Sequence, residues 1–305
     1  METVDWRATA VPELRNILIA GKLDVPVRFS GLLTGKDLPP GFSSRNLDEA
    51  RTRIHYDRLV ANRIGAGEMF WVSADMTGLA LDAAGDVPGF TPSEDLPAPS
   101  GFMVLGRPLP TMDTWVLAQG MKEVPAALPI EALSWTTLEG MIFIEGYCRG
   151  TAVEMAREVD SFFEPVRFFR GKVSRFFDCE AEDIDEPSHR LMQFLAAASH
   201  LMANPAVTDR TRLVPKTPGA RKAAKKGRTT DVTVVDLRAP HHVETGEKSE
   251  SGRVYTHRWI VRGHWRNQAH GKNHAQRRIT WVPSYTKGPA GKPLKETERV
   301  WAWRR

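Results

Sequence analysis

The chain has 305 residues, of which 41% are apolar and 26% are charged, proportions that are ordinary for folded proteins and sufficient for a hydrophobic core. No run of about 18 apolar residues is present, which excludes a membrane-spanning helix, and we expect no secretory signal peptide because the start lacks an apolar segment with a cleavage site. The two cysteines, Cys148 and Cys179, exclude a disulfide framework or zinc ribbon and favour a reducing cytoplasm.

The charge is distributed unevenly along the chain. Residues 1–210 hold 20 Lys and Arg against 30 Asp and Glu, whereas residues 211–305 hold 22 against 7. The net charge is therefore −10 in the first part and +15 in the second. Such an asymmetry favours a polyanionic partner, most often nucleic acid. The alternative is that the basic part docks on the acidic part.

The first half alternates between helical and strand-like patterns. The spacing of apolar residues predicts a helix over 47–65 that ends at a glycine. A short buried strand is expected at 68–73, and Ser73 can cap the helix that follows it and closes at Gly85. Four prolines make 86–101 a loop. Further strands are expected at 102–110 and 141–148.

The second half begins with helices and ends with strands. Residues 151–203 show helical spacing, with a final helix that starts after Pro187, has Ser188 as its expected cap and stops at Asn204. Prolines, glycines and six Lys or Arg over 214–231 indicate a basic linker or arm. Strands are then expected at 231–238, 253–267, 278–283 and 298–305. We predict an α+β protein with an acidic α/β part at 1–210, a basic linker at 211–231 and a basic, mostly antiparallel sheet or partly open barrel at 232–305.

The stretch 253–267 is expected to be a strand with two different faces, because side chains alternate along a strand. One face is largely aromatic and aliphatic and consists of Tyr255, His257, Trp259, Val261, Gly263 and Trp265. The other face is cationic and consists of Arg258, Ile260, Arg262, His264 and Arg266. Gly263 can mark a bulge, which would reverse the alternation after it.

We predict that this basic part binds nucleic acid, with RNA favoured over DNA. The planar guanidinium of arginine binds two phosphate oxygens at once, and exposed tryptophans can stack on bases. Most tryptophans are expected in the core, with Trp265 and Trp303 available. The expected contact residues are Arg258, Arg262, Arg266, Trp265, Arg277, Arg278, Lys287 and Trp303.

Six of the nine histidines lie in the last 65 residues, and histidine can take or give a proton near neutral pH. Metal-independent RNA cleavage needs a base, an acid and cations that stabilise the phosphorane. His264 with Arg262 and Arg266, helped by His257 or His270, could supply that set for a toxin-like or defence-linked ribonuclease. No cofactor is expected. In the plainest alternative these histidines are polar residues of a basic surface.

Two further alternatives involve a metal and a nucleotide. His264, His270 and His274 could give three nitrogen ligands, but the glycine and asparagine between them indicate a loop instead of a helix, and we expect no metal site. The strand-then-helix pattern of residues 67–84, with His55 and Tyr56 upstream, has the shape seen near the start of ADP-ribosyltransferase sites.

The segment RGHWRNQAHG, followed by RRITWVPSYTKGP and by VWAWRR, resembles the C-terminal signature of a family of actinobacterial and actinophage proteins. The stretch LPAPSGFMV (96–104) is similar to an upstream element of that family, and together these segments cover about a third of the chain. The resemblance implies a cytoplasmic protein of actinobacteria or their mobile elements, and it carries no catalytic role. The main prediction is thus a nucleic-acid-binding protein, and the alternatives are an interaction module whose basic sheet docks on an acidic surface and a nucleotide-using transferase.

Overall fold

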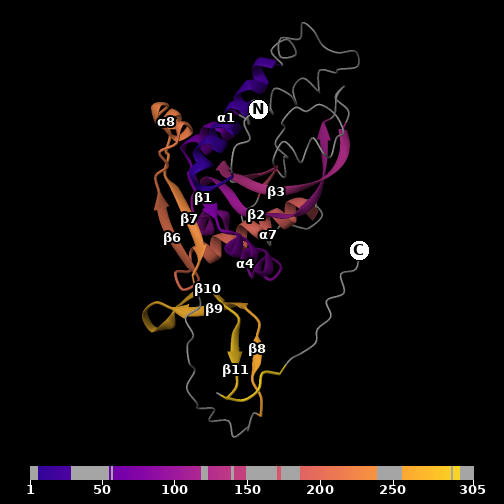
Figure 1. Ribbon diagram of the computed structural model, residues 1–305, viewed down its shortest axis with the longest axis vertical. Coiled ribbons are helices and arrows are strands. Elements are labelled where there is room, and N and C mark those ends of the chain that lie inside the picture. The colour runs from indigo at the N-terminus through magenta and orange to yellow at the C-terminus, as the bar shows by residue number, and fades with distance from the viewer. Residues whose placement is uncertain are drawn as a thin grey trace. The chain divides into compact units, whose positions relative to one another are not determined.

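The computed structural model describes residues 6–28, 55, 58–117, 123–138, 141–148, 170–172, 186–238, 256–289 and 291–295. The chain divides into two compact units, Met1–Leu237 and Arg238–Arg305. The first contains helices and a mixed sheet, and the second contains short antiparallel strand pairs (Figure 1). The predicted α+β class is therefore confirmed, and the strands that the structure describes form no closed barrel.

A seven-stranded mixed sheet with the order β5-β4-β3-β2-β1-β7-β6 forms the centre of the first unit. Its strands are β1 (Glu68–Val72), β2 (Ser100–Leu117), β3 (Glu123–Leu138), β4 (Met141–Tyr147), β5 (Arg170–Lys172), β6 (Thr208–Leu213) and β7 (Val232–Leu237). Strand β1 runs parallel to both of its neighbours, β2 and β7. The other neighbouring pairs are antiparallel.

The described helices of this unit are a short 3-10 turn (Ala8–Ala10), α1 (Val11–Arg28), α4 (Ala74–Ala84), α5 (Pro92–Asp95), α7 (Glu186–Met202) and α8 (Pro218–Lys225). Residues 58–66 are also helical. Helix α4 connects the parallel strands β1 and β2, as such a crossover requires. Its predicted cap is confirmed, because the backbone N–H of Met76 donates to Oγ of Ser73 at 3.4 Å and the helix ends at Gly85.

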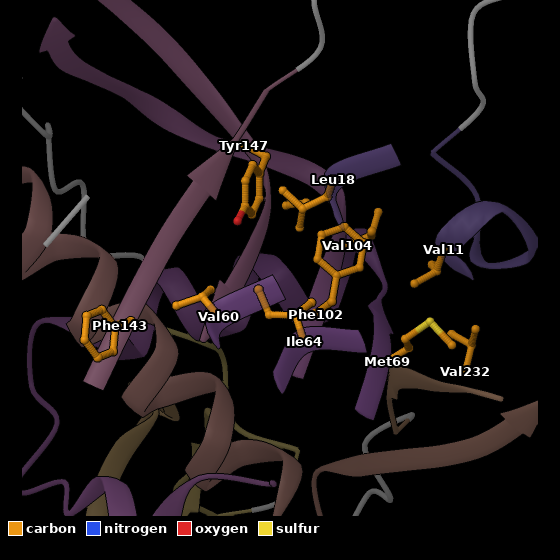
Figure 2. Packing of buried hydrophobic residues seen from close by; sticks show 11 residues of the cluster. Val11, Leu18, Val60, Ile64, Met69, Phe102, Val104, Phe143, Tyr147 and Val232 are labelled. Atoms are coloured by element: carbon orange, nitrogen blue, oxygen red, sulfur yellow. The ribbon is translucent and has the colours of Figure 1, made fainter. Parts of the chain in front are cut away.

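Alternate residues of the strands face two different layers. Met69 of β1 and Phe102 and Val104 of β2 belong to a buried cluster that includes Val11 and Leu18 of α1. Figure 2 shows the side chains of this cluster, which come from helices and from several strands of the sheet. Residues of the opposite parity point to the other face, which helices α4 and α7 cover while packing against each other. The sheet is thus buried between helices on both faces.

Trp135 shows how closely this second face is packed. It is fully buried, stacks on Phe70 with ring centroids 5.7 Å apart, and donates its indole N–H to the carbonyl of Ala98 at 2.8 Å. Its partner in the register of β2 and β3 is Gly101. A Cβ atom at position 101 would lie 2.3 Å from the indole ring, so only glycine leaves room for this tryptophan.

A buried arginine connects α1 to the segment before β7. Arg15 is fully buried and donates hydrogen bonds to the carbonyls of Gly67, at 3.2 Å, and Thr229. Burial, with a smaller contribution from the positive charge of Arg228, lowers the pKa of Arg15 to about 10. Arg228 in turn donates to Oδ1 of Asn16 at 2.7 Å, and together these bonds fix α1 against the chain that follows α8.

The described part of the second unit consists mainly of one bent antiparallel ribbon. Its strands are β8 (Trp259–Val261), β9 (His264–His270), β10 (Gln276–Val282) and β11 (Tyr285–Lys287). β9 pairs with β10, and β8 pairs with β11. Val261 pairs with Tyr285, and His264 pairs with Val282. Two unpaired residues separate these pairings on each strand, so the register continues without a shift from one pair of strands to the other. Figure 1 shows the ribbon changing direction at this interruption.

Several local expectations differ from the structure. The strand expected at 253–267 is interrupted at residues 262–263, and Gly263 does not reverse the alternation of side chains. The range 211–231, expected as a linker, contains the end of β6 and helix α8. Helix α7 begins at Glu186, so Ser188 is not its cap. β5 lies in a segment for which we expected a helix. The strand expected at 298–305 lies outside the described residues.

Candidate interaction surface on the bent ribbon

The two faces of the β9–β10 pair differ sharply in chemistry. Residues directly opposite each other in an antiparallel pair share a face, so one face is read from the register. It consists of His264, Arg266, Gln268 and His270 of β9 and of Gln276, Arg278, Thr280 and Val282 of β10, and we call it the cationic face. His264, Arg266 and Arg278 on it are exposed.

The opposite face is aromatic and more buried. Trp265 and Trp281 are directly paired, and their rings meet edge to face with centroids 5.0 Å apart. Trp281 is only 6% exposed, while Trp265 is half-buried. An isolated two-stranded ribbon is only marginally stable in water, so it needs an apolar face whose side chains pack. The contact between the two tryptophans supplies that face.

Arg277 and Arg278, both expected to contact the partner, point to opposite sides of the ribbon. Arg278 pairs with Gln268 on the cationic face, whereas Arg277 pairs with Ala269 on the aromatic face. Trp265, expected to be available for stacking, is half-buried and packs edge to face on Trp281. A surface built on the cationic face therefore includes Arg278 and excludes these other two.

The remaining expected contact residues lie at or beyond the bend. Arg262 is exposed in the interruption, and Lys287 is exposed on β11. Arg258 is held in place, because its Nε donates to the carbonyl of Lys292 at 2.8 Å. Trp303 lies outside the described residues, so the structure places every other expected contact residue but not this one.

The histidines expected to cooperate in catalysis are spread along the ribbon. His264 and His270 lie at the two ends of β9, six residues apart, which corresponds to about 20 Å along a strand. His257 precedes β8 and contacts Trp259, with ring centroids 6.0 Å apart. His264 lies close to Arg262, because Nδ1 of His264 is 3.1 Å from the carbonyl oxygen of Arg262. Arg266 lies on the same face of β9 as His264. An acid and a base that act on one phosphate must both lie within hydrogen-bond reach of it, and the length of β9 separates His264 from His270.

The three histidines of the metal alternative lie on β9 and in the turn that follows it. His274 lies in the turn between β9 and β10, where Asn273 and His274 both adopt positive φ angles. Among the residues that the structure describes, no group of three His, Cys, Asp or Glu side chains is arranged to hold a metal ion.

One feature of the first unit is missed by the sequence analysis. A shallow pocket of about 240 Å³ is lined by Glu68, Phe70, Pro97, Arg210, Thr211, Arg212 and Thr233. Phe70, Thr233 and Arg212 are neighbours across β1, β7 and β6, and Arg212 forms an ion pair with Asp231. The signal was the Arg-x-Arg pattern of β6, which we assigned partly to a linker.

The comparisons with known proteins identify the family. The model of the AcrVA2-like family, described as the anti-CRISPR type V subtype A2 family, matches residues 79–286. The chain belongs to this family. The matched range is more than half of the chain and extends over parts of both units.

A solved structure is also similar to this AcrVA2-like chain. The crystal structure of AcrVA2 shares 12% sequence identity, covers 90% of this chain and 93% of its own, and has a TM-score of 0.40. A search of the curated proteins finds no match. No helix in the described part of the chain is both long and apolar enough to cross a membrane.

Membership of an anti-CRISPR family corrects the predicted function. Because of the family match, the prediction of a nucleic-acid-binding protein or ribonuclease is wrong, and neither the docked basic sheet nor the nucleotide-using transferase is favoured. The RNA-binding and nuclease assignments fail for the same reason. A run of arginines and histidines reports positive charge, which does not specify the chemical class of the partner. The resemblance to actinophage proteins around residues 264–271 is not confirmed as a separate module.

Proposed function

We propose that this AcrVA2-like protein inhibits type V CRISPR–Cas immunity. The observation that carries the proposal is the family match over residues 79–286. The protein would act in the cytoplasm of a bacterium, to the advantage of a phage or another mobile element, since immunity of this kind targets such elements. The proposal shares with the context expected from the sequence the setting of a phage or mobile element.

The partner would be a type V effector complex, in which a protein carries a guide RNA that pairs with the target DNA. The second unit, with the ribbon, would be the contact module. We place the contact on the cationic face and at the bend, where Arg262, His264, Arg266 and Arg278 lie together. The seven-stranded first unit would be the scaffold, and residues 211–231 would belong to it through α8.

The proposal is tested in bacteria that carry a type V system and a plasmid that it targets. Co-expression of this protein is expected to restore plasmid transformation to the level of a strain without the effector. Immunoblotting for the effector and a cleavage assay with the purified complex separate inhibition of the complex from loss of the effector. Unchanged interference, with the protein present in folded form, would refute the proposal.

A further inference from the structure

The helices that cover one face of the seven-stranded sheet end before the sheet does. On this face Val235 of β7 is fully buried, and Thr208 of β6 donates its hydroxyl to the carbonyl of Leu201 in α7 at 2.8 Å. Arg212 lies on the same face of β6, four residues further along the strand, and is exposed. The pocket of about 240 Å³ in the first unit lies on this uncovered part of the sheet.

The floor of the pocket is apolar. Phe70 of β1, which is only 2% exposed, lies beside its register partner Thr233 of β7. Pro97, from the segment after α5, adds a second apolar surface. The hydroxyl of Thr233 can donate and accept hydrogen bonds. The pocket thus offers a small apolar surface with one neutral polar group beside it.

Two arginines border the pocket on the side of β6. Arg210 and Arg212 lie two residues apart on one strand, about 7 Å from each other, so their side chains leave the same face. Arg212 forms an ion pair with Asp231, and its side chain is still 74% exposed. One carboxylate engages at most two of the five N–H donors of a guanidinium, so Arg212 keeps donors for a ligand. The side chain of Arg210 makes no hydrogen bond or ion pair with another described residue.

A carboxylate borders the pocket on the side of β1. Glu68, the exposed first residue of that strand, is part of the lining. Strand β7 lies between β1 and β6, so the backbones that carry the acid and the two arginines are two strand spacings apart, about 10 Å. A phosphate ester would bring its negative charges close to Glu68 and Asp231, which repel them.

Opposite charges on the two sides select a ligand that carries both charges itself. The arginines match a carboxylate, and Glu68 matches an ammonium group. One water takes about 30 Å³ in the liquid, so a pocket of about 240 Å³ has room for about eight non-hydrogen atoms. Aliphatic α-amino acids such as valine and leucine have this size, and their branched side chains can pack on Phe70 and Pro97.

We propose that this pocket binds a free aliphatic α-amino acid. The carboxylate of the ligand bonds Arg210 and Arg212, its ammonium group bonds Glu68, and its side chain packs on Phe70. The inference is independent of the proposed function, because the pocket belongs to the sheet of the first unit and shares no residue with the cationic face.

The test measures binding of leucine to the full-length protein by isothermal titration calorimetry. Isocaproate is leucine without its ammonium group, and isoamylamine is leucine without its carboxylate. We expect leucine to bind at least about tenfold more tightly than either analogue, because each analogue loses hydrogen bonds between ionised groups.

Two variants locate the binding site. Glu68→Gln should weaken leucine binding at least about tenfold and remove the preference for leucine over isocaproate. Arg210→Gln should weaken leucine binding by a similar factor and remove the preference for leucine over isoamylamine. Asp82→Asn and Arg221→Gln are the matched controls, because both residues are exposed on helices outside the pocket lining and the changes in charge are the same. Both controls should bind leucine as the wild type does.

A second measurement needs no variant, so it decides even if a substitution perturbs folding. Leucine added to the wild type should shift the amide NMR signals of Phe70, Arg212 and Thr233. Shifts confined to other parts of the chain overturn the location of the site, and so does equal leucine affinity of Glu68→Gln and wild type. Isocaproate that binds as tightly as leucine overturns the choice of a zwitterion. Absence of leucine binding at millimolar concentration overturns the inference altogether, and inhibition of type V immunity is untouched by each of these results.

Discussion

Gly263 lies directly against the indole ring of Trp281. A Cβ atom at position 263 would stand 2.5 Å from Cζ2 of that ring and 3.2 Å from the carbonyl oxygen of Val282. The ribbon therefore requires glycine at position 263, because a side chain there would collide with the indole ring of Trp281. The same relationship between Gly101 and Trp135 occurs in the sheet of the first unit.

Gly263→Ala should accordingly loosen the ribbon. Forcing a methyl group against a packed indole typically costs about 1–3 kcal/mol, and Trp281 is the buried side chain on which the aromatic face depends. Hydrogen–deuterium exchange of the amides of residues 259–287 should become faster, while the amides of the seven-stranded sheet should be unaffected.

Gly85→Ala is the control for this substitution, because nothing lies within 4 Å of a Cβ atom there. It should leave exchange in both units as it is in the wild type. Unchanged exchange in Gly263→Ala would mean that the ribbon can shift its tryptophan without loss of stability.

A chain of hydroxyl groups lies in the core of the first unit and gives a second prediction. The phenol of Tyr147 donates to Oε2 of Glu145 at 2.6 Å, so the hydroxyl of Ser134, at 2.8 Å, donates to the phenol oxygen. Tyr147→Phe removes both bonds. It should lower the free energy of unfolding by about 1–3 kcal/mol, because Ser134 stays buried without this partner. Chemical denaturation measures the loss.

Tyr285→Phe removes the same hydroxyl from a tyrosine that is 42% exposed. Water replaces any bond lost there, so the midpoint of denaturation should not move. Equal effects of the two substitutions would contradict a role for the buried chain of hydroxyl groups.

The helix α4 and the strand before it could be predicted because every local signal agreed. The apolar run of β1, the cap Ser73 and the closing Gly85 stand in the order that the structure shows. Strand β3 was not predicted. Its sequence contains Pro125 and Pro129, and its pairing with β2 has register shifts, so no simple alternation is visible in the sequence.

Helix α8 was overlooked because its composition is that of a linker. The decisive signals were Thr217, whose Oγ1 accepts from the N–H of Ala220 at 3.2 Å, and Pro218 at the first helical position. Ala220 and Ala223, three residues apart, form its buried side, and α8 packs on α1. The packing of α8 on α1 is a tertiary contact, and the composition of a basic, alanine-containing stretch does not predict it.

For the ribbon, the sequence predicted which residues share a face but not where the ribbon bends. Opposite the interruption at Arg262 and Gly263 lie Pro283 and Ser284, and proline has no N–H to donate to a partner strand. The identity of the partner could not be predicted, because charge alone is shared by surfaces that bind RNA, DNA and proteins.

The third prediction concerns the cationic face. The double variant Arg266→Glu, Arg278→Glu reverses two charges on facing strands of one surface. It should weaken binding to the type V effector complex about tenfold, mainly through slower association, and make the remaining affinity less sensitive to salt. Surface plasmon resonance at several salt concentrations measures both effects.

Arg221→Glu is the control, because Arg221 is exposed on α8 in the first unit. It changes the net charge by the same amount per residue without touching the ribbon. If it slows association as much per residue as the double variant does, the effect is one of overall charge and the contact lies elsewhere.

The last prediction concerns Arg15, whose pKa is lowered to about 10 by burial and by Arg228. In the unfolded chain this guanidinium regains its ordinary, higher pKa. Between these values the unfolded chain holds more protons than the folded one, so the free energy of unfolding rises with pH. At pH 11 this single group should contribute about 1 kcal/mol more stability than at pH 8.

Other groups titrate over the same range, so the measurement is a difference between two proteins. The free energy of unfolding of wild type minus that of Arg15→Met should increase from pH 8 to pH 11. The same difference for Val214→Met should stay constant, since the exposed Val214 has no titratable group. A difference that stays flat for Arg15 would mean that the hydrogen bonds to Gly67 and Thr229 keep the guanidinium protonated throughout, and that its burial is fully compensated.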